Sequence, residues 1–291
     1  MIGLSITPIV VDTDNALGQL THQLLPGDVD DAFAIAYLLK SKLVDVKTIL
    51  SVGGNATAEA CHRNNMDLCR VAESEIQCIQ GFNKKDFYND NDRINIESCD
   101  SYLSLGPLTN LAKLLKHNYS TKHIWMTLGR IKTRGSYPPI WPMEFNATQD
   151  LEAFKSVFKS NIPKTIVPLD VAIRLRFEKS FSAEMEKSII GNYLMTHIKR
   201  WQIRNILLKG RSHFPVWDLV SAMALTNPET CQTEKGKGYL FSNGLLLCDV
   251  HHQAQTSHDR KHAIAVQEID IITSINHELI WKIFFKALQN P

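Results

Sequence analysis

The chain has 291 residues, 44% of them hydrophobic, and its formal net charge at pH 7 is +2. This near-neutral balance, with no segment dominated by Lys or Arg, argues against nucleic acid as a partner, because such binding depends on clustered basic charge. No apolar run is long enough to cross a membrane, and no cationic segment precedes the first apolar run. We therefore expect a protein of the cytoplasm whose six cysteines are reduced thiols.

Short β-rich runs alternate with helical patterns along the chain. Strands are predicted at residues 6–12, 44–52, 76–80, 100–106, 123–129 and 164–170. Helices are predicted between and after them at residues 30–41, 56–73, 107–118 and 150–160, followed by a mainly helical segment at 179–226. The remaining elements are a hairpin at 238–250, a strand at 261–267 and a helix at 276–288.

Buried strands that alternate with crossover helices are typical of an α/β fold, with a mostly parallel central sheet and helices on both faces. The chain shows no internal repeat and no evident linker, so we expect one domain over residues 1–291. In such sheets ligands bind beyond the carboxyl ends of the strands. Functional residues should therefore follow strands.

Aspartates gather where the first predicted strand is followed by the first helix. Asp12 and Asp14 end the strand, and Asp30 and Asp31 begin the helix. Helix capping would explain one or two of these acids, because acidic residues in a first turn complement the helix dipole. It explains four less well, because like charges held together repel one another without a counter-ion. A hard divalent cation such as Ca²⁺ or Mg²⁺, which prefers oxygen ligands, resolves the conflict.

Several sequence blocks, in order along the chain, resemble the inosine–uridine-preferring nucleoside hydrolase family. "VVDTD…GDVDDAFAIAYLL" resembles the family's DTDPGxDDAxAL signature. The blocks that follow are "ILSVGGNATAEACHRN", "LSLGPLTNLA", "MEFNATQDLEAFKSVF", "VPLDV" and "VWDLVSAMAL". The resemblance implies a Ca²⁺-dependent enzyme that hydrolyses the N-glycosidic bond of ribonucleosides to free base and ribose. It also implies a small nucleoside substrate and a homo-oligomer, either a dimer or a tetramer.

The resemblance assigns roles position by position. The Ca²⁺ ligands would be the side chains of Asp14, Asp31 and Asp218 and the backbone carbonyl of Leu105. Asp30 would be the general base for the attacking water. The substrate contacts would be Asn55, Glu144 and Asn146 at the ribose, and Trp217 and Trp141 at the base. Asp12 would either contact the ribose as well or orient groups near it.

Trp217 stands where members that favour broad or pyrimidine substrates have His. It resembles the purine-preferring branch, which stacks the leaving base on tryptophan, and stacking on an indole face polarises a purine and raises its basicity. We therefore expect a preference for purines. Core packing at a helix start is the alternative role for Trp217, and His213 is an alternative proton donor.

Three segments depart from the family's pattern. Residues 15–26 are inserted between Asp14 and Gly27, either as a flap over the site or as a spacer that separates the aspartate pairs, and we favour the flap. Residues 81–98 replace a longer segment, and "MTLGR" at 126–130 replaces an MGG-type run. These departures keep open a second hypothesis, namely a metal- and nucleoside-binding protein of the same fold that has lost turnover.

Two other patterns carry less weight. "DTDNAL" also resembles the opening of haloacid dehalogenase-type phosphatases, but those need an acidic pair far along the chain, and here Asp30 and Asp31 follow too soon. The histidines within residues 248–262 lack the tight geometry of a zinc site, and we expect a solvated loop there.

Overall fold

A computed structural model describes residues 6–18, 27–84, 93–131, 144–210, 213–250 and 261–290. The strands are β1 (Thr7–Thr13), β2 (Val44–Ser51), β3 (Gln77–Gln80), β4 (Cys99–Ser104), β5 (Thr121–Thr127), β6 (Lys164–Val167), β7 (Arg176–Phe177), β8 (Phe214–Pro215), β9 (Cys231–Leu240), β10 (Leu246–Val250) and β11 (Ala265–Ile275). The helices are α1 (Asp30–Lys40), α2 (Ala58–Val71), α3 (Thr109–Lys116), α4 (Phe145–Gln149), α5 (Leu151–Lys159), α6 (Leu169–Ala172), α7 (Ser182–Met185), α8 (Ile189–Lys209), α9 (Trp217–Thr226) and α11 (His277–Leu288).

Within the described residues, nine strands form one sheet in the order β10-β9-β11-β6-β5-β4-β1-β2-β3. The strands from β3 through β6 to β11 pair in parallel, and β9 pairs antiparallel with both of its neighbours. The strand order reverses at β1, because β2 and β3 continue on one side of it and β4, β5 and β6 on the other. Such a reversal opens a crevice at the carboxyl ends of the central strands.

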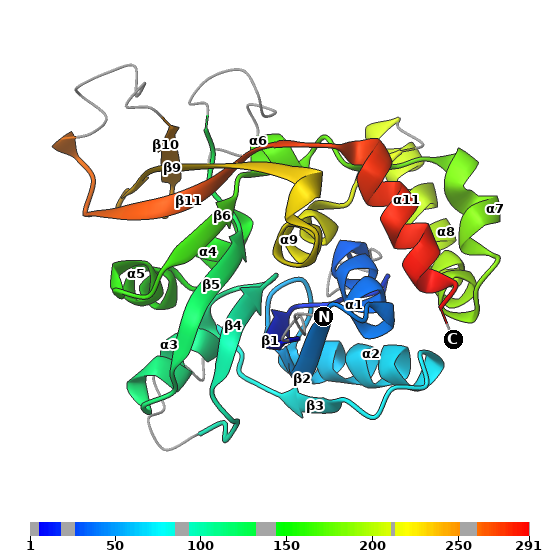
Figure 1. The fold of residues 1–291 in the computed structure, drawn as a ribbon, viewed down its shortest axis with the longest axis horizontal. Helices are drawn as coiled ribbons and strands as arrows, with labels where there is room; N and C mark the ends of the chain where they lie inside the picture. The colour runs from blue at the N-terminus through cyan, green and yellow to red at the C-terminus, as the bar shows by residue number, and fades with distance from the viewer. Residues whose placement is uncertain are drawn as a thin grey trace, which may run out of the picture.

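Helices cover both faces of the sheet, as Figure 1 shows, with α3 and α5 on one face and α1, α8, α9 and α11 on the other. Successive residues of a strand point to opposite faces, so each central strand contributes to two cores. Ile9 and Val11 belong to the core beneath α1 and α9, and Val10 belongs to the core beneath α3 and α5. The predicted α/β class is therefore confirmed.

Helix α1 occupies the centre of the larger core. Its residues from Asp30 to Leu38 are all buried, which suits a helix enclosed by the sheet and by other helices. The ring of Phe33 lies 5.5 Å from that of Phe177 and 5.6 Å from that of Phe284, measured between centroids. This packing fixes the direction of α1 and hence the position of the acids in its first turn.

Several element boundaries differ from the prediction. The predicted strand 164–170 is too long, because β6 ends at Val167 and α6 begins at Leu169. The hairpin's first strand begins already at Cys231, and β11 runs on to Ile275 rather than ending at 267. Both strands alternate exposed and partly buried residues over part of their length, so the apolar pattern that marks the central strands is weak there.

The helices of the structure bear on the expectation that no segment crosses a membrane. In the part of the chain that the structure describes, no helix combines the length and the apolar character that crossing a membrane requires.

Candidate functional site

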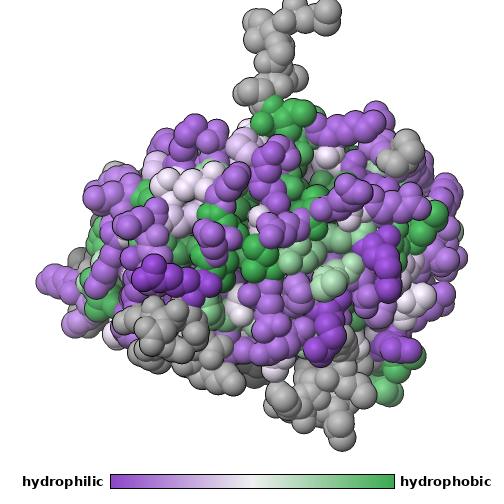
Figure 2. All heavy atoms as spheres, turned by 90° about the horizontal axis from the view of Figure 1, so that it is seen from below, coloured by the Kyte–Doolittle hydropathy of each residue, from purple (hydrophilic) through white to green (hydrophobic). Residues whose placement is uncertain are grey.

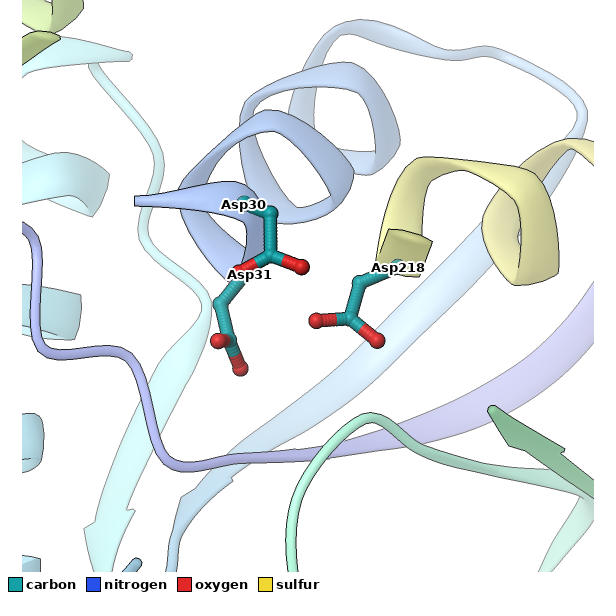
Figure 3. A group of neighbouring side chains, drawn as sticks. All are labelled: Asp30, Asp31 and Asp218. Carbon is teal, nitrogen blue, oxygen red and sulfur yellow. The ribbon is translucent and has the colours of Figure 1, made fainter. Parts of the chain in front are cut away.

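Three aspartates meet beyond the carboxyl ends of β1 and β5. Asp30 and Asp31 are the first two residues of α1, and Asp218 is the second residue of α9. All three are buried, and each offers a carboxylate oxygen within 4.8 Å of the others (Figure 3). The N-termini of both helices meet here, so the positive ends of two helix dipoles favour negative charge at this point.

Burial and mutual repulsion oppose ionisation of the cluster. Burial is the largest cause that raises the pKa of Asp30 well above its usual range, followed by the charges of Asp28 and Asp218. Burial and then the charge of Asp31 do the same to the pKa of Asp218. Burial raises the pKa of Asp31 to about 7, against a hydrogen bond from Thr13 that lowers it. A divalent cation would replace the protons, and an all-oxygen donor set fits Ca²⁺ or Mg²⁺.

Asp14 borders the same cluster from the end of β1. Its charge raises the pKa of Asp218, and its Oδ2 atom accepts a 2.6 Å hydrogen bond from the backbone amide of Asn55. A Cβ atom on Gly54 would collide with Asp14 Oδ2, and a Cβ atom on Gly106 would lie 2.9 Å from Asp14 Oδ1. The loops after β2 and β4 therefore enclose this carboxylate closely, as only glycine permits.

Asp12 faces away from these acids, toward β4 and α3. Its Oδ2 atom accepts a 2.7 Å hydrogen bond from the Tyr102 hydroxyl, and its Oδ1 atom accepts one of 2.8 Å from Asn110 Nδ2. Burial raises its pKa to about 7 in spite of these donors. Of the two roles expected for Asp12, the geometry favours the support of neighbouring groups over contact with a sugar.

The predicted carbonyl ligand and one predicted sugar contact touch each other. The carbonyl oxygen of Leu105 accepts a 2.9 Å hydrogen bond from Asn146 Nδ2. A carbonyl oxygen has two lone pairs, so this bond leaves one for a cation. Asn146 thus ties helix α4 to the segment that follows β4.

Glu144 lies beside α4 and forms a buried ion pair. Its side chain is 1% exposed, and Oε1 lies 3.6 Å from Nε of Arg130, which is itself 13% exposed. Burial raises the pKa of Glu144 to about 7, while the Arg130 charge and the Gly129 amide act in the opposite direction. The arginine comes from "MTLGR", the segment that departs from the family's pattern.

Of the two tryptophans predicted to contact the base, only Trp217 is among the described residues. Trp217 is half-buried and packs against the core beneath α1. Its indole N–H is buried and, within the described residues, has no hydrogen-bond acceptor. His213 Nε2 lies 3.4 Å from Arg176 Nη1. Trp141 lies outside the described residues.

The inserted segment leaves the aspartate pairs together. The hydroxyl of Thr13 donates a hydrogen bond to Asp31, so the end of β1 touches the start of α1. The backbone amide of Gly18 donates to the carbonyl of Asp28 at 3.4 Å. The alternative in which the insertion separates the pairs is therefore wrong. Residues 19–26 lie outside the described residues, so the flap stays a prediction.

Asn15, the first inserted residue, is held by an amide network on α2. Asn15 Nδ2 donates to Asn65 Oδ1 at 2.9 Å, and Asn64 Nδ2 donates to the Asn15 carbonyl at 2.7 Å. Asn65 in turn donates to Ser51 Oγ at 3.1 Å. The network anchors the chain directly after Asp14.

Sequence reasoning missed several polar groups of the site. Thr127 forms a hydrogen bond with Asp218 and lies 2.7 Å, hydroxyl to hydroxyl, from Ser221. Thr127 ends β5, so the rule that functional residues follow strands would have found it. The pairing of Arg130 with Glu144 had no comparable signal, because it arises only on folding.

Known proteins resemble this chain in sequence. It is 26% identical over 200 residues to the non-specific ribonucleoside hydrolase RihC of Salmonella schwarzengrund, a match that covers 56% of this chain and 61% of that protein. It is 27% identical over 210 residues to RihC of Salmonella paratyphi B, covering 60% and 64% respectively. The chain thus spans about three fifths of the length of the curated relatives it matches.

Solved structures show the same fold. A plant nucleoside hydrolase, the PpNRh1 enzyme, superposes with a TM-score of 0.78 at 18% identity, over 98% of this chain and 99% of that one. A purine-preferring ribonucleoside hydrolase from Gardnerella vaginalis gives a TM-score of 0.71 at 17% identity, over 97% and 98%. Residues 97–282, more than half of the chain, match the family described as inosine-uridine preferring nucleoside hydrolase. The chain belongs to the inosine-uridine preferring nucleoside hydrolase family.

Proposed function

We propose that the protein hydrolyses the N-glycosidic bond of ribonucleosides, releasing free base and ribose, in a Ca²⁺-dependent reaction. The observation that carries the proposal is the buried group of Asp30, Asp31 and Asp218 at the point where the strand order reverses. Three buried carboxylates at such short range need a cation, and the family supplies the reaction class.

The proposed metal site consists of Asp14, Asp31 and Asp218, with the backbone carbonyl of Leu105. When bound, Ca²⁺ supplies Lewis acidity for a water and binding energy for vicinal hydroxyls of the sugar. Asp30 is the proposed general base, which accepts the proton that the attacking water loses. Its ionisation at neutral pH requires the cation's charge, because burial and then its acidic neighbours raise its pKa in the protein alone.

The proposed sugar contacts are Asn55, Glu144 and Asn146, with Asp12 in a supporting position. Contacts that strengthen as the sugar gains positive charge would accelerate the reaction rather than only bind substrate. Trp217 and Trp141 are the proposed stacking groups for the base. The half-buried indole of Trp217, adjacent to Asp218, supports a purine preference.

The first experiment measures ribose release from inosine, adenosine, guanosine, uridine and cytidine, with Ca²⁺ and with chelator. We expect release that depends on Ca²⁺ and is faster with the purine nucleosides. Equal rates with purines and pyrimidines would contradict the role of Trp217. Release that persists in chelator would contradict the metal requirement.

Substitutions at Asp30 and Asp31 distinguish the proposed general base from the proposed Ca²⁺ ligands. Asp30→Asn should lower kcat by about 10²–10⁴-fold while nucleoside and Ca²⁺ affinity stay within a few fold. Asp31→Asn should lose Ca²⁺ affinity as well. Asp67→Asn, at an exposed aspartate paired with Arg70, is the matched control and should behave as the unaltered protein. If Asp30→Asn loses Ca²⁺ together with turnover, Asp30 is a ligand and another carboxylate is the base.

One observation favours the second candidate, a nucleoside-binding protein without turnover. Glu144 is paired with Arg130, so one proposed sugar contact already has a partner within the protein. Binding of Ca²⁺ and inosine without ribose release from any of the five nucleosides would support this candidate. Assembly as a dimer or tetramer and a cytoplasmic location stay predictions, and light scattering on the purified protein tests the first.

A further inference from the structure

Two cysteines outside the proposed site lie with their sulfur atoms side by side. Cys69 is in helix α2 and Cys78 is in strand β3, and their Sγ atoms are 3.5 Å apart. Both are free thiols. A disulfide bond is about 2.05 Å long, so a movement of about 1.5 Å shared between two side chains would bring the sulfurs to bonding distance.

The pair is accessible from one side. Strand β3 is the last strand of the sheet, so beyond it no further strand of this sheet covers its edge among the described residues. Cys78 is half-buried, and the residues at both ends of β3 are exposed. Figure 2 views the molecule from the side on which β3 lies in Figure 1, and there hydrophobic residues are interspersed among hydrophilic ones. Cys78 is therefore the member of the pair that a small oxidant reaches more readily, because Cys69 is buried.

The hydrogen bond between the sulfurs makes the two thiols unequal. The hydrogen bond between the two thiols lowers the pKa of Cys78, whereas the same bond and then burial raise the pKa of Cys69. Cys78 is therefore the sulfur that ionises first, and the thiolate is the nucleophile in thiol oxidation. The more reactive sulfur is also the more exposed one.

We propose that Cys69 and Cys78 are a redox modification site, at which hydrogen peroxide converts the two thiols into a disulfide that joins α2 to β3. The Cys78 thiolate attacks the peroxide oxygen and becomes a sulfenic acid, and the O–O bond breaks to release water once the leaving oxygen is protonated. The Cys69 sulfur then attacks the Cys78 sulfur, and the sulfenic oxygen leaves as a second water. Overall, two thiols lose two hydrogens and one hydrogen peroxide is reduced to two waters.

The other cysteines do not offer this geometry. Cys61, Cys99 and Cys248 are buried, with other groups around them. Cys231 is half-buried like Cys78, but its sulfur lies 3.4 Å from the hydroxyl of Thr230. Cys231 is therefore a matched control, because it has similar exposure without a neighbouring sulfur.

The proposed bond would add a covalent tie where hydrogen bonds already connect the same segments. The side chain of Asn83, three residues beyond β3, accepts a 2.9 Å hydrogen bond from the amide of Ala58, the first residue of α2. The disulfide would restrict the unfolded chain and should raise the melting temperature. This inference does not depend on the proposed hydrolysis.

The experiment treats the folded protein with hydrogen peroxide, unfolds it, alkylates the free thiols and measures the intact mass and the peptide map. We expect two of the six thiols to escape alkylation, a Cys69–Cys78 linked peptide, and reversal by a dithiol reductant. Cys69→Ser and Cys78→Ser should each abolish the linked peptide, and Cys231→Ser should leave it unchanged.

Other outcomes would overturn the proposal. Full alkylation of all six thiols after peroxide would show that the pair does not react. A Cys78 sulfinic acid without cross-link, or a disulfide between other cysteines, would show that Cys69 does not resolve the sulfenic acid. Because the linked peptide is sought in the unaltered protein, a variant that fails to fold does not leave the question open.

Discussion

The positively charged side chain of Arg130 affects whether the buried carboxyl group of Glu144 is ionised. Burial raises its pKa to about 7, and the Arg130 charge and the Gly129 amide oppose that rise. The charged groups that act on it are Arg130 and Asp170, with the thiol of Cys248 nearby. In its proposed role as a sugar contact, an ionised Glu144 would accept hydrogen bonds through both oxygens, whereas protonation turns one oxygen into a donor, so this balance would alter substrate binding.

Removing the arginine's charge should therefore change the pH dependence of the reaction. For the unaltered protein we expect kcat/KM to fall as pH drops through about 7, because Glu144 takes up a proton there. In Arg130→Gln the pKa of Glu144 rises further, so the fall should begin at a higher pH and appear mainly in KM. Arg130→Lys keeps the charge and should retain most of the original profile. Identical pH profiles for the Gln variant and the unaltered protein would contradict the role of Arg130.

A second prediction at the scale of single residues concerns Gly54. A methyl group there would collide with Asp14 Oδ2, and neighbouring atoms of Pro107 leave little room to move. Gly54→Ala should therefore displace the carboxylate and weaken Ca²⁺ binding by about 10–100-fold, measured by isothermal titration calorimetry. Its fold should be intact by circular dichroism. Unchanged Ca²⁺ affinity would show that Asp14 is not a ligand or that the loop yields easily.

At the scale of elements, helix α2 anchors the chain that leaves β1. The Asn65 amide bonds both Asn15 and Ser51, so it joins the inserted segment to the strand end of β2. Because this network is buried, each polar group that loses its partner is left without a hydrogen bond and without water. The network therefore holds the chain directly after Asp14 in place.

Truncating Asn65 tests that anchoring. Asn65→Ala should lower the free energy of unfolding by about 1–3 kcal/mol, measured by urea denaturation, because Asn15 and Ser51 each lose a partner. Met66→Ala, on the exposed side of the same helix, is the control and should change it by less than about 0.5 kcal/mol. Similar losses in the two variants would mean that the network contributes no more than an exposed position.

At the scale of the whole molecule, the buried acids should couple the proposed metal binding to stability. Asp12 and Asp31 have folded pKa values of about 7, above those of unfolded aspartates, so the native state holds more protons than the unfolded one. Without cation, the stability that these groups contribute is present at low pH, below the unfolded pKa. It is lost as pH rises through the folded pKa.

Ca²⁺ should therefore stabilise the protein most at higher pH. At about a hundredfold excess over the Kd we expect Tm to rise by about 5 °C or more at pH 8, and by clearly less at pH 5.5, where protons compete for the carboxylates. Differential scanning fluorimetry with Ca²⁺ and with chelator at both pH values measures this difference. A rise that is equal at both pH values would contradict the coupling.

The central part of the fold was predictable because its elements carry strong local patterns. Strand β1 contains the apolar run Ile-Val-Val, β2 combines β-branched residues with a leucine, and the acids at the start of α1 follow a strand end. The C-terminal strands were predicted poorly, because β9 carries charged residues such as Glu234, Lys235 and Lys237 among its partly exposed positions. Their strand form depends on pairing with β10 and β11, which no local window contains.

The same distinction applies to the candidate site. The carboxylates lie in recognisable sequence blocks, and the structure brings Asp30, Asp31 and Asp218 together. Arg130 with Glu144 and Asn15 with Asn65 are partners only in three dimensions, and nothing in the adjacent sequence marks either pair. A pattern of apolar and polar residues does not determine which side chains pair in this way.

The long stretch of sequence between the first acids of the cluster and Asp218 also has a consequence for the order in which the molecule is synthesised and folds. The first acids of the cluster leave the ribosome early, but Asp218 follows about two hundred residues later, and long-range contacts of this kind form late in folding. A nascent chain that ends before α9 lacks one of the converging carboxylates. Acquisition of the cation should therefore be among the last steps of biogenesis, and ribosome-bound chains of increasing length should begin to retain Ca²⁺ only after α9 has emerged.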